Sequence, residues 1–285
     1  MQYSKPNDFK FNKNRRRNML PKKKVIKEEV RLNILGCGTS TGVPLISCKC
    51  HVCRSKNPKN RRLRASAWIR TRGKSLLIDT STDFRQQALR EKIPRVDAVL
   101  YTHPHADHVH GIDELRSYNF IQGASIPAYG NEWTCRELTH KFEYIFKPQP
   151  VAGGGIPQLD LNCIRTESES FEAAGVPIIP ISLKHGSQEC VAYRIDGIAY
   201  VTDCSYIPPL SLDRLRGLSV LVLDCLRIQP HGTHFNLDQA LEVISELRPK
   251  KTFLTHLGHD FEYTEWTKKL PKGVYLAYDG LSIRI

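Results

Sequence analysis

Apolar and polar positions in the first third of the chain alternate with the period of β-strands. Alternation over residues 32–35 runs into glycines at 36 and 38, which predicts a strand that ends in a turn. Runs at 67–70 and 75–79 flank Arg72-Gly73-Lys74 and predict a β-hairpin. Residues 83–92 predict a helix, and the apolar stretch at 97–101 predicts a short strand that ends just before His103.

The second half of the chain mixes strands and helices. Helices are predicted over residues 132–146, 237–247 and 263–269, and apolar residues in the second of these recur every three or four positions on one face. Further strands are predicted at 178–183, 191–194, 198–202, 220–223, 252–255 and 274–276. This mixture predicts an α+β fold in which two sheets form a sandwich with helices on its outer faces.

A single domain accounts for most of the chain. Residues 1–30 are rich in Lys, Arg and Asn without apolar periodicity, and we interpret them as a disordered basic tail. Residues 31–285 are then the folded domain. Within it, residues 147–161 contain three prolines and three consecutive glycines and predict a loop or a small insertion.

Positive charge is concentrated in two segments. The chain of 285 residues has a net charge of +13, to which the tail contributes +7 and residues 54–74 contribute +9. These segments are either solvated surface or binding sites for phosphate-bearing partners, nucleic acid through the tail among them. No apolar run has the length of a membrane span and no secretory signal is present, so we expect a cytoplasmic protein without a membrane partner. Nine cysteines are then expected to be thiols or metal ligands.

The densest cluster of metal-binding side chains follows the strand at 97–101. The segment His103-Pro104-His105-Ala106-Asp107-His108 offers four ligands in six residues, and imidazole with carboxylate suits Zn, Mn or Fe ions. On extended backbone His103 and His105 point the same way, whereas Asp107 and His108 fall where the chain turns into a helix. One compact segment can therefore serve two adjacent ions.

Two ions need further ligands from elsewhere in the chain. Candidates stand at the ends of predicted strands: His185, Asp203 and His256. A carboxylate such as Asp203 can bridge two cations, which imidazole does not readily do. We expect these residues to converge with the histidine cluster at one edge of the sandwich.

In their order along the chain these motifs resemble the metallo-β-lactamase superfamily of di-metal hydrolases over residues 31–285. The resemblance implies a four-layer αβ/βα sandwich and two divalent cations, Mn²⁺ or Zn²⁺, with Asp203 bridging them. It assigns the other ligands in two sets: His103, His105 and His185 for one cation, and Asp107, His108 and His256 for the other.

A second cluster contains three thiols within six residues: Cys48, Cys50 and Cys53. Thiolates prefer zinc, and a closed structural zinc site needs a fourth ligand. His259 is the candidate, because its spacing of three from His256 sends the two rings to opposite sides of an extended chain, one to each site. His51 is the rival, although it lies inside a tight loop where reaching the same ion would strain the backbone.

The cysteine loop, the turn Gly36-Cys37-Gly38-Thr39-Ser40 and the pair His256-Leu257-Gly258-His259 together resemble one subfamily, the phosphoribosyl cyclic phosphodiesterases of phosphonate breakdown. The resemblance implies one structural Zn²⁺ on the three cysteines and His259. It also implies a catalytic histidine at His234, with Asp107 as the second catalytic residue. His231, three residues before His234, departs from the family pattern and leaves the identity of the acid open.

We therefore expect a phosphoric diester hydrolase that opens a small cyclic ester, such as a ribosyl 1,2-cyclic phosphate, on a phosphorylated sugar or nucleotide. Two divalent ions lower the pKa of water and neutralise phosphodiester charge. His234 is expected to protonate the leaving oxygen, or else to cap the following helix. Asp79 and Asp224, each at a strand end, either orient a histidine of the site or serve as cap and turn residues. A ribonuclease Z-like RNA-processing nuclease is the alternative function, and a homodimer stays open.

Overall fold

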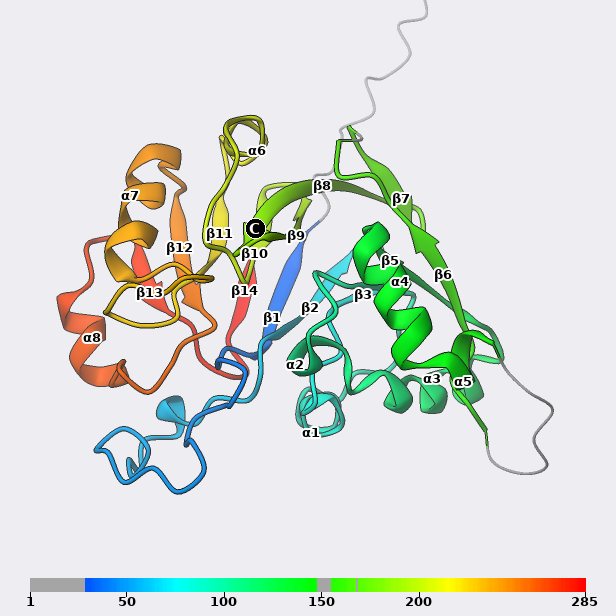
Figure 1. The fold of residues 1–285 in the computed structure, drawn as a ribbon, viewed down its shortest axis with the longest axis horizontal. Helices are drawn as coiled ribbons and strands as arrows, with labels where there is room; N and C mark the ends of the chain where they lie inside the picture. The colour runs from blue at the N-terminus through cyan, green and yellow to red at the C-terminus, as the bar shows by residue number, and fades with distance from the viewer. Residues whose placement is uncertain (1–28, 148–154, 168) are drawn as a thin grey trace, which may run out of the picture.

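The structure is a computed structural model that describes residues 29–147, 155–167 and 169–285 (Figure 1). Val30, placed in the tail by the sequence prediction, already belongs to the fold, because its side chain is buried and its N–H donates to the Ile285 carbonyl over 3.2 Å. The tail before Glu29 lies outside the described residues, and its disorder stays a prediction.

Two seven-stranded sheets form the centre of the molecule. In spatial order the first sheet consists of β14 (Ser282–Arg284), β1 (Arg31–Gly36), β2 (Ser66–Thr71), β3 (Lys74–Ile78), β4 (Ala98–Leu100), β5 (Ile126–Gly130) and β6 (Leu159–Cys163). The second consists of β13 (Val274–Leu276), β12 (Lys251–Thr255), β11 (Val220–Asp224), β10 (Ile198–Val201), β9 (Gln188–Ile195), β8 (Val176–His185) and β7 (Phe171–Ala173).

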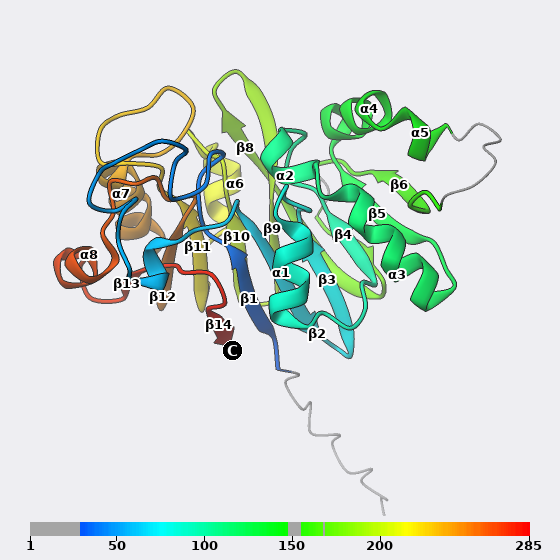
Figure 2. The same cartoon turned by 90° about the horizontal axis from the view of Figure 1, so that it is seen from below.

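Helices cover the outer faces of both sheets (Figures 1 and 2). Those beside the first sheet are α1 (Phe84–Glu91), α2 (Ala106–Val109), α3 (Leu115–Gln122), α4 (Glu132–Lys141) and α5 (Glu143–Phe146). Those beside the second sheet are α6 (Pro209–Arg214), α7 (Leu237–Leu247) and α8 (Tyr263–Lys269). Two short 3₁₀ helices span Pro58–Asn60 and Ile112–Glu114. The predicted four-layer αβ/βα sandwich is confirmed.

Alternation along the strands builds the layers, because successive side chains of a strand point to opposite faces of its sheet. In β2, Ala67 and Ile69 join the core between the two sheets, whereas Trp68 packs into a separate core with α1 and α3. In β3, Leu76 and Leu77 divide in the same way. The first sheet is thus apolar on both faces, one for the partner sheet and one for the helices.

Two segments have a secondary structure that differs from the one predicted from the sequence. Residues 132–146 form α4 and α5 rather than one helix, because Phe142 leaves helical geometry (φ −119°, ψ 47°) and buries its ring among the helices of the first sheet. The segment predicted as a loop at 147–161 ends inside a strand, since β6 pairs in parallel with β5 through Leu161 and Ala128. The rest of that segment, residues 148–154, lies outside the described residues.

Among the described residues, every helix is too short or too polar to cross a lipid bilayer.

Candidate metal centre and active site

The predicted site residues stand where parallel strands of both sheets end. Strands β3 and β4 run parallel in the first sheet, and β10, β11 and β12 run parallel in the second. Asp79 follows β3 directly, Asp224 ends β11 and His256 follows β12. His103 and Asp203 come within three residues of the ends of β4 and β10. Carboxyl ends of parallel strands meet at one edge, where α/β folds commonly bind their ligands.

Three of these residues have an unusual backbone conformation. Asp79, Asp203 and His256 have φ values of 62°, 53° and 56°, in the left-handed region. A residue with a Cβ atom pays about 1–2 kcal/mol for this conformation. Such strain persists only where the surrounding structure fixes it, and it clusters at functional sites. Each of the three turns therefore holds a site residue at a strand end.

The structure brings the predicted ligands together in two groups, in each of which all ligand atoms lie within 4.8 Å of one another: His103, His105 and His185 in the first, and Asp107, His108, Asp203 and His256 in the second. Asp203 reaches both groups. Its Oδ2 lies 3.6 Å from His103 Nε2, and its Oδ1 lies 3.2 Å from His108 Nε2. This is the position that a bridging carboxylate requires.

Atoms without hydrogen-bond partners point into the second group. Asp107 Oδ2, His108 Nε2 and His256 Nε2 are buried, and no described residue hydrogen-bonds to them. Asp107 Oδ2 lies 3.2 Å from His108 Nε2 and 3.6 Å from His256 Nε2. Donors that share a cation at about 2.0–2.2 Å lie about 3–3.6 Å apart. Leaving a buried polar atom unsatisfied costs about 1–3 kcal/mol. The residues therefore fit a divalent cation.

Hydrogen bonds behind the ligands orient two of the histidines. His108 Nδ1 donates to Asp79 Oδ2 over 2.7 Å, and Asp79 also accepts from the Thr102 N–H and the Thr102 hydroxyl, each over 2.8 Å. His185 Nδ1 donates to the Thr233 carbonyl over 2.8 Å. With Nδ1 engaged in this way, Nε2 is the free nitrogen of each ring, as in other metal-binding histidines. Burial raises the pKa of Asp79, while the neighbouring His108 and the Thr102 hydrogen bonds oppose that rise.

His234 lies at the rim of the two groups and is held by Asp224. Its Nδ1 donates to Asp224 Oδ1 over 3.3 Å, and the Phe235 N–H donates to Asp224 Oδ2 over 3.0 Å. Its ring stacks on His256 with centroids 4.6 Å apart. Burial disfavours the charged form, but the Asp224 carboxylate outweighs burial and raises the pKa of His234 to about 9.

Helix capping does not explain His234. The N-cap of α7 is Asn236, whose side chain accepts from the Gln239 N–H in a capping box. Asp224 favours the protonated form of His234 beside the ligand groups, so this side chain is a candidate proton donor.

The cysteine cluster forms a compact second site. His259 Nδ1 lies 3.4 Å from Cys48 Sγ, 3.6 Å from Cys50 Sγ and 3.4 Å from Cys53 Sγ. Tetrahedral zinc with typical bond lengths would place nitrogen and sulfur ligands about 3.6 Å apart. The four residues therefore fit one Zn²⁺. His51, the rival ligand, is exposed and lies outside this group.

Sequence reasoning missed the residue that connects the two sites. Arg62 is only 2% exposed, and its Nη1 donates to the Gly258 carbonyl over 2.9 Å, between His256 and His259. The same guanidinium also donates to the Phe261 carbonyl. Thr102 and Thr233 were missed as well. The one sequence signal for Thr102 is its place directly before His103.

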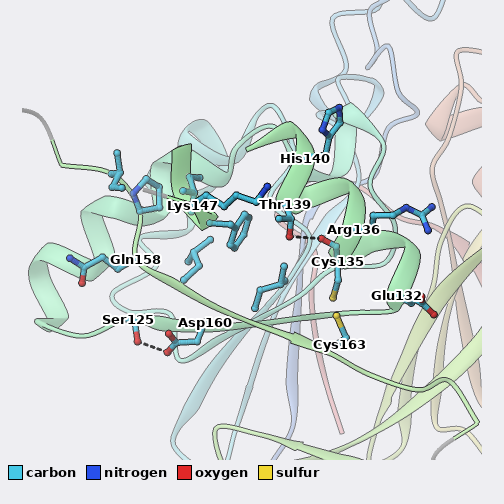
Figure 3. A pocket seen from close by; sticks show the side chains of 16 residues that line it. Ser125, Glu132, Cys135, Arg136, Thr139, His140, Lys147, Gln158, Asp160 and Cys163 are labelled. Atoms are coloured by element: carbon cyan, nitrogen blue, oxygen red, sulfur yellow. Dashed lines mark hydrogen bonds between the residues drawn. The ribbon is translucent and has the colours of Figure 1, made fainter. Parts of the chain in front are cut away.

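The metal centre opens on the side of His105. That residue is exposed while the other members of both groups are buried, and its ring meets the edge of Trp133 with centroids 6.0 Å apart. A separate cavity of about 1150 Å³ lies between α4, α5 and β6 (Figure 3). None of the predicted ligands is among the described residues that line it. The exposed edge at His105, rather than this cavity, gives access to the metal centre.

A four-layer sandwich with paired ligand groups at its strand ends defines a class of metal-dependent hydrolases. In agreement, a family model described as the Beta-lactamase superfamily domain matches residues 74–257, more than half of the chain. The chain belongs to this superfamily. Its fold implies divalent metal ions in the centre described above.

Three known proteins illustrate the relationship. A diphosphatase of the PhnP family is 43% identical over 90% of this chain and 97% of that chain, with a TM-score of 0.84. An octanoyltransferase of Porphyromonas gingivalis is 35% identical over 88% of this chain, which spans only 51% of that protein. The short form of human tRNase Z is 17% identical over 89% of this chain and 98% of that chain, with a TM-score of 0.61, and shows a shared fold alone. Together with the site, the family match and the similarity to the diphosphatase identify a metal-dependent phosphoester hydrolase.

Proposed function

We propose that the protein is a di-metal phosphodiesterase that hydrolyses a small cyclic phosphodiester, such as a ribosyl 1,2-cyclic phosphate. The observation that carries the proposal is the position of Asp203, within 3.2–3.6 Å of histidines from both ligand groups. A second support is His234 beside these groups. Similarity to a diphosphatase over almost the whole chain supports a phosphoryl substrate.

Seven side chains of the protein would bind the two cations in the active site. Two divalent ions, Mn²⁺ or Zn²⁺, would supply Lewis acidity toward phosphoryl oxygens and a lowered pKa for bound water. The side chains that would hold them are His103, His105 and His185 on one side, Asp107, His108 and His256 on the other, and Asp203 between them. Cys48, Cys50, Cys53 and His259 would hold one structural Zn²⁺.

Asp107 and His234 carry the charges that the reaction uses. Burial raises the pKa of Asp107, but the adjacent His108 and His256 outweigh burial and hold the pKa well below its usual value. Asp107 therefore stays anionic as a ligand. His234, with Nδ1 held by Asp224, presents Nε2 toward the site and gives its proton to the leaving oxygen, a role that contributes about 10²–10⁴-fold.

The basic segment at 54–74 argues against an RNA-processing nuclease. Five of its nine cations contact other residues of the protein. Arg62 is buried, whereas four contacts lie at or near the surface: Arg64 with Asp83 at 3.1 Å, Arg72 with Asp196 at 2.9 Å, Arg70 on Trp68 and Lys59 over Tyr263. Charges held in this way contribute less to a continuous surface for a phosphate backbone. Nucleic-acid binding through the tail and a homodimer remain predictions.

Diphosphate hydrolysis is a second candidate, favoured by the 43% identity to a diphosphatase. The same ligand groups could neutralise the charge of a phosphoric anhydride. A nucleoside phosphate leaving group is less basic than a sugar alkoxide, so diphosphate hydrolysis would depend less on His234.

A panel of substrates tests the proposal. Metal-loaded protein would be offered a ribosyl 1,2-cyclic phosphate, a 2′,3′-cyclic nucleotide, a nucleoside diphosphate sugar, pre-tRNA and a β-lactam, with the Asp203→Ala variant as the control for contaminating activity. We expect the cyclic esters to be hydrolysed with the highest kcat/KM. Preferred cleavage of the diphosphate or of pre-tRNA would replace the proposal with the corresponding candidate.

A further inference from the structure

The loop between β11 and α7 is held in one shape by its own hydrogen bonds. At its base the Leu226 N–H donates to the Phe235 carbonyl over 2.9 Å. Along its course the Arg227 guanidinium donates to the carbonyls of Gln229 and Pro230 over 3.1 and 2.5 Å. A functional group carried by such a loop is positioned before a ligand arrives.

The loop carries His231 with a defined hydrogen-bonding role. The Thr233 N–H donates to His231 Nδ1 over 3.3 Å, and the Thr233 hydroxyl lies 3.2 Å from the same nitrogen. A neutral imidazole that accepts at Nδ1 carries its proton on Nε2. Burial and the neighbouring His234 and Arg227 lower the pKa of His231, which keeps the ring neutral near pH 7. His231 therefore offers one N–H donor.

His231 lies on the outer side of His234. The two rings have centroids 5.3 Å apart, while the His234 ring lies 4.6 Å from His256 and 4.7 Å from His185. His231 is half-buried, whereas His234 is only 8% exposed. Going outward from the ligand groups, His234 comes first and His231 second. When a cyclic ester opens, one P–O bond breaks and the freed oxygen stays on the sugar, so the part of the sugar beyond the oxygen that His234 protonates would face His231.

We propose that His231 binds the leaving group. Its Nε2–H donates a hydrogen bond to an oxygen of the leaving sugar, next to the oxygen that His234 protonates. The site then selects phosphodiesters whose leaving alcohol carries a neighbouring hydroxyl or ring oxygen over esters of a simple aryl alcohol. This inference rests on the proposed function, because that function defines the leaving group.

Kinetics of His231→Ala on two substrates test the inference. For a 2′,3′-cyclic nucleotide we expect kcat/KM to fall about tenfold, the usual worth of one lost hydrogen bond. For bis(p-nitrophenyl) phosphate, which has no neighbouring oxygen on its leaving group, kcat/KM stays within about twofold of the wild type. His231→Gln, which keeps an N–H donor, recovers part of the loss, and His140→Ala on the exposed face of α4 changes neither rate. Equal losses on both substrates, or no loss on either, would overturn the inference.

Equilibrium binding separates this inference from the proposed function. Metal-loaded wild type is titrated calorimetrically with a ribonucleoside 3′-monophosphate and with inorganic phosphate. We expect tighter binding of the nucleotide, and loss of that preference in His231→Ala. If wild type hydrolyses neither cyclic nucleotide nor aryl ester, the proposed function fails while this titration still decides the role of His231. A wild type without the preference, or a variant that keeps it, contradicts that role.

Discussion

The cysteine site and the candidate di-metal centre are built from the same kind of residues in opposite ways. Three of the four ligands at the cysteine site come from six consecutive residues, and only His259 comes from a distant segment. The seven candidate ligands of the di-metal centre come from four distant stretches of the chain: five follow or end strands of the two sheets, and Asp107 and His108 lie on helix α2. The cysteine site therefore depends mainly on one loop, whereas the di-metal centre depends on the correct packing of both sheets.

The two sites also differ in their donor atoms. The cysteine site offers three soft sulfur atoms and one imidazole, the donor set of a closed structural zinc. The di-metal centre offers imidazole and carboxylate groups, a shared Asp203 and an exposed edge at His105. Nitrogen and oxygen donors with an open side suit catalysis. We therefore expect that changes at the cysteine site lower the stability of the protein, whereas changes at the candidate di-metal centre lower its turnover.

Asp203→Ala is expected to have the largest effect on turnover. Removing the carboxylate that both groups share should lower kcat at least about 10³-fold, because a metal contributes several kcal/mol to the transition state. Metal analysis should show loss of the cations at this centre and retention of the zinc at the cysteine site. Asp213→Ala on the exposed face of α6 is the control. An Asp203→Ala variant with full activity contradicts the bridging position.

His234→Ala should cost about 10²-fold in turnover on a substrate with a poor leaving group, with metal content unchanged. Because Asp224 raises the pKa of His234 to about 9, the acid form is present below that pH and is lost as pH rises through it. Asp224→Asn should therefore move the basic limb of the kcat–pH profile to lower pH. A profile that does not respond to Asp224→Asn would remove His234 as the acid.

Asp79→Asn should weaken the di-metal centre without disturbing the cysteine site. Loss of the charged acceptor for His108 Nδ1 is expected to reduce metal affinity about 10–100-fold, measured by competition with a chelator. Asp196→Asn, at the exposed turn between β9 and β10, serves as the matched control. Unchanged metal affinity in Asp79→Asn would contradict a role for Asp79 in orienting His108 toward the metal.

Cys48→Ser is expected to have the smallest effect on turnover and a large effect on stability. Losing a structural metal typically costs about 4 kcal/mol or more, which corresponds to a fall in Tm of about 10 °C. At a temperature where the variant is folded, kcat should stay within about threefold of wild type. Cys163→Ser, at an exposed cysteine, should change neither Tm nor kcat. A folded Cys48→Ser variant that loses turnover would show that the two sites are not separate.

The parts of the fold that the sequence predicts are those whose own residues carry a pattern. Strand β3 alternates between two apolar cores, and α7 has one apolar stripe, so both are visible in the sequence. Strands β7 and β14 span three residues each and are too short to show a period. Strand β6 has only two partly buried leucines, Leu159 and Leu161, and three exposed residues, so its pairing with β5 contributes more to its definition than burial does.

The residues of the site likewise fall into those that the sequence predicts and those that it does not. Residue type and position in the sequence predict two kinds of ligand. The first are ligands concentrated in one segment, such as His103 and His105, and the second are residues at strand ends, such as His256. The hydrogen bonds of Thr233 and Arg62 depend on segments that meet only after folding. Neither residue carries a sequence signal, because a backbone carbonyl or a buried guanidinium can serve many local purposes.

Anomalous scattering from crystals of the metal-loaded protein tests the central claim most directly. We predict two peaks on either side of the Asp203 carboxylate, one among His103, His105 and His185 and one among Asp107, His108 and His256. A third peak should lie among the three cysteines and His259. Metal at the cysteines alone, with no peak beside Asp203 at saturating Mn²⁺ or Zn²⁺, would contradict the account.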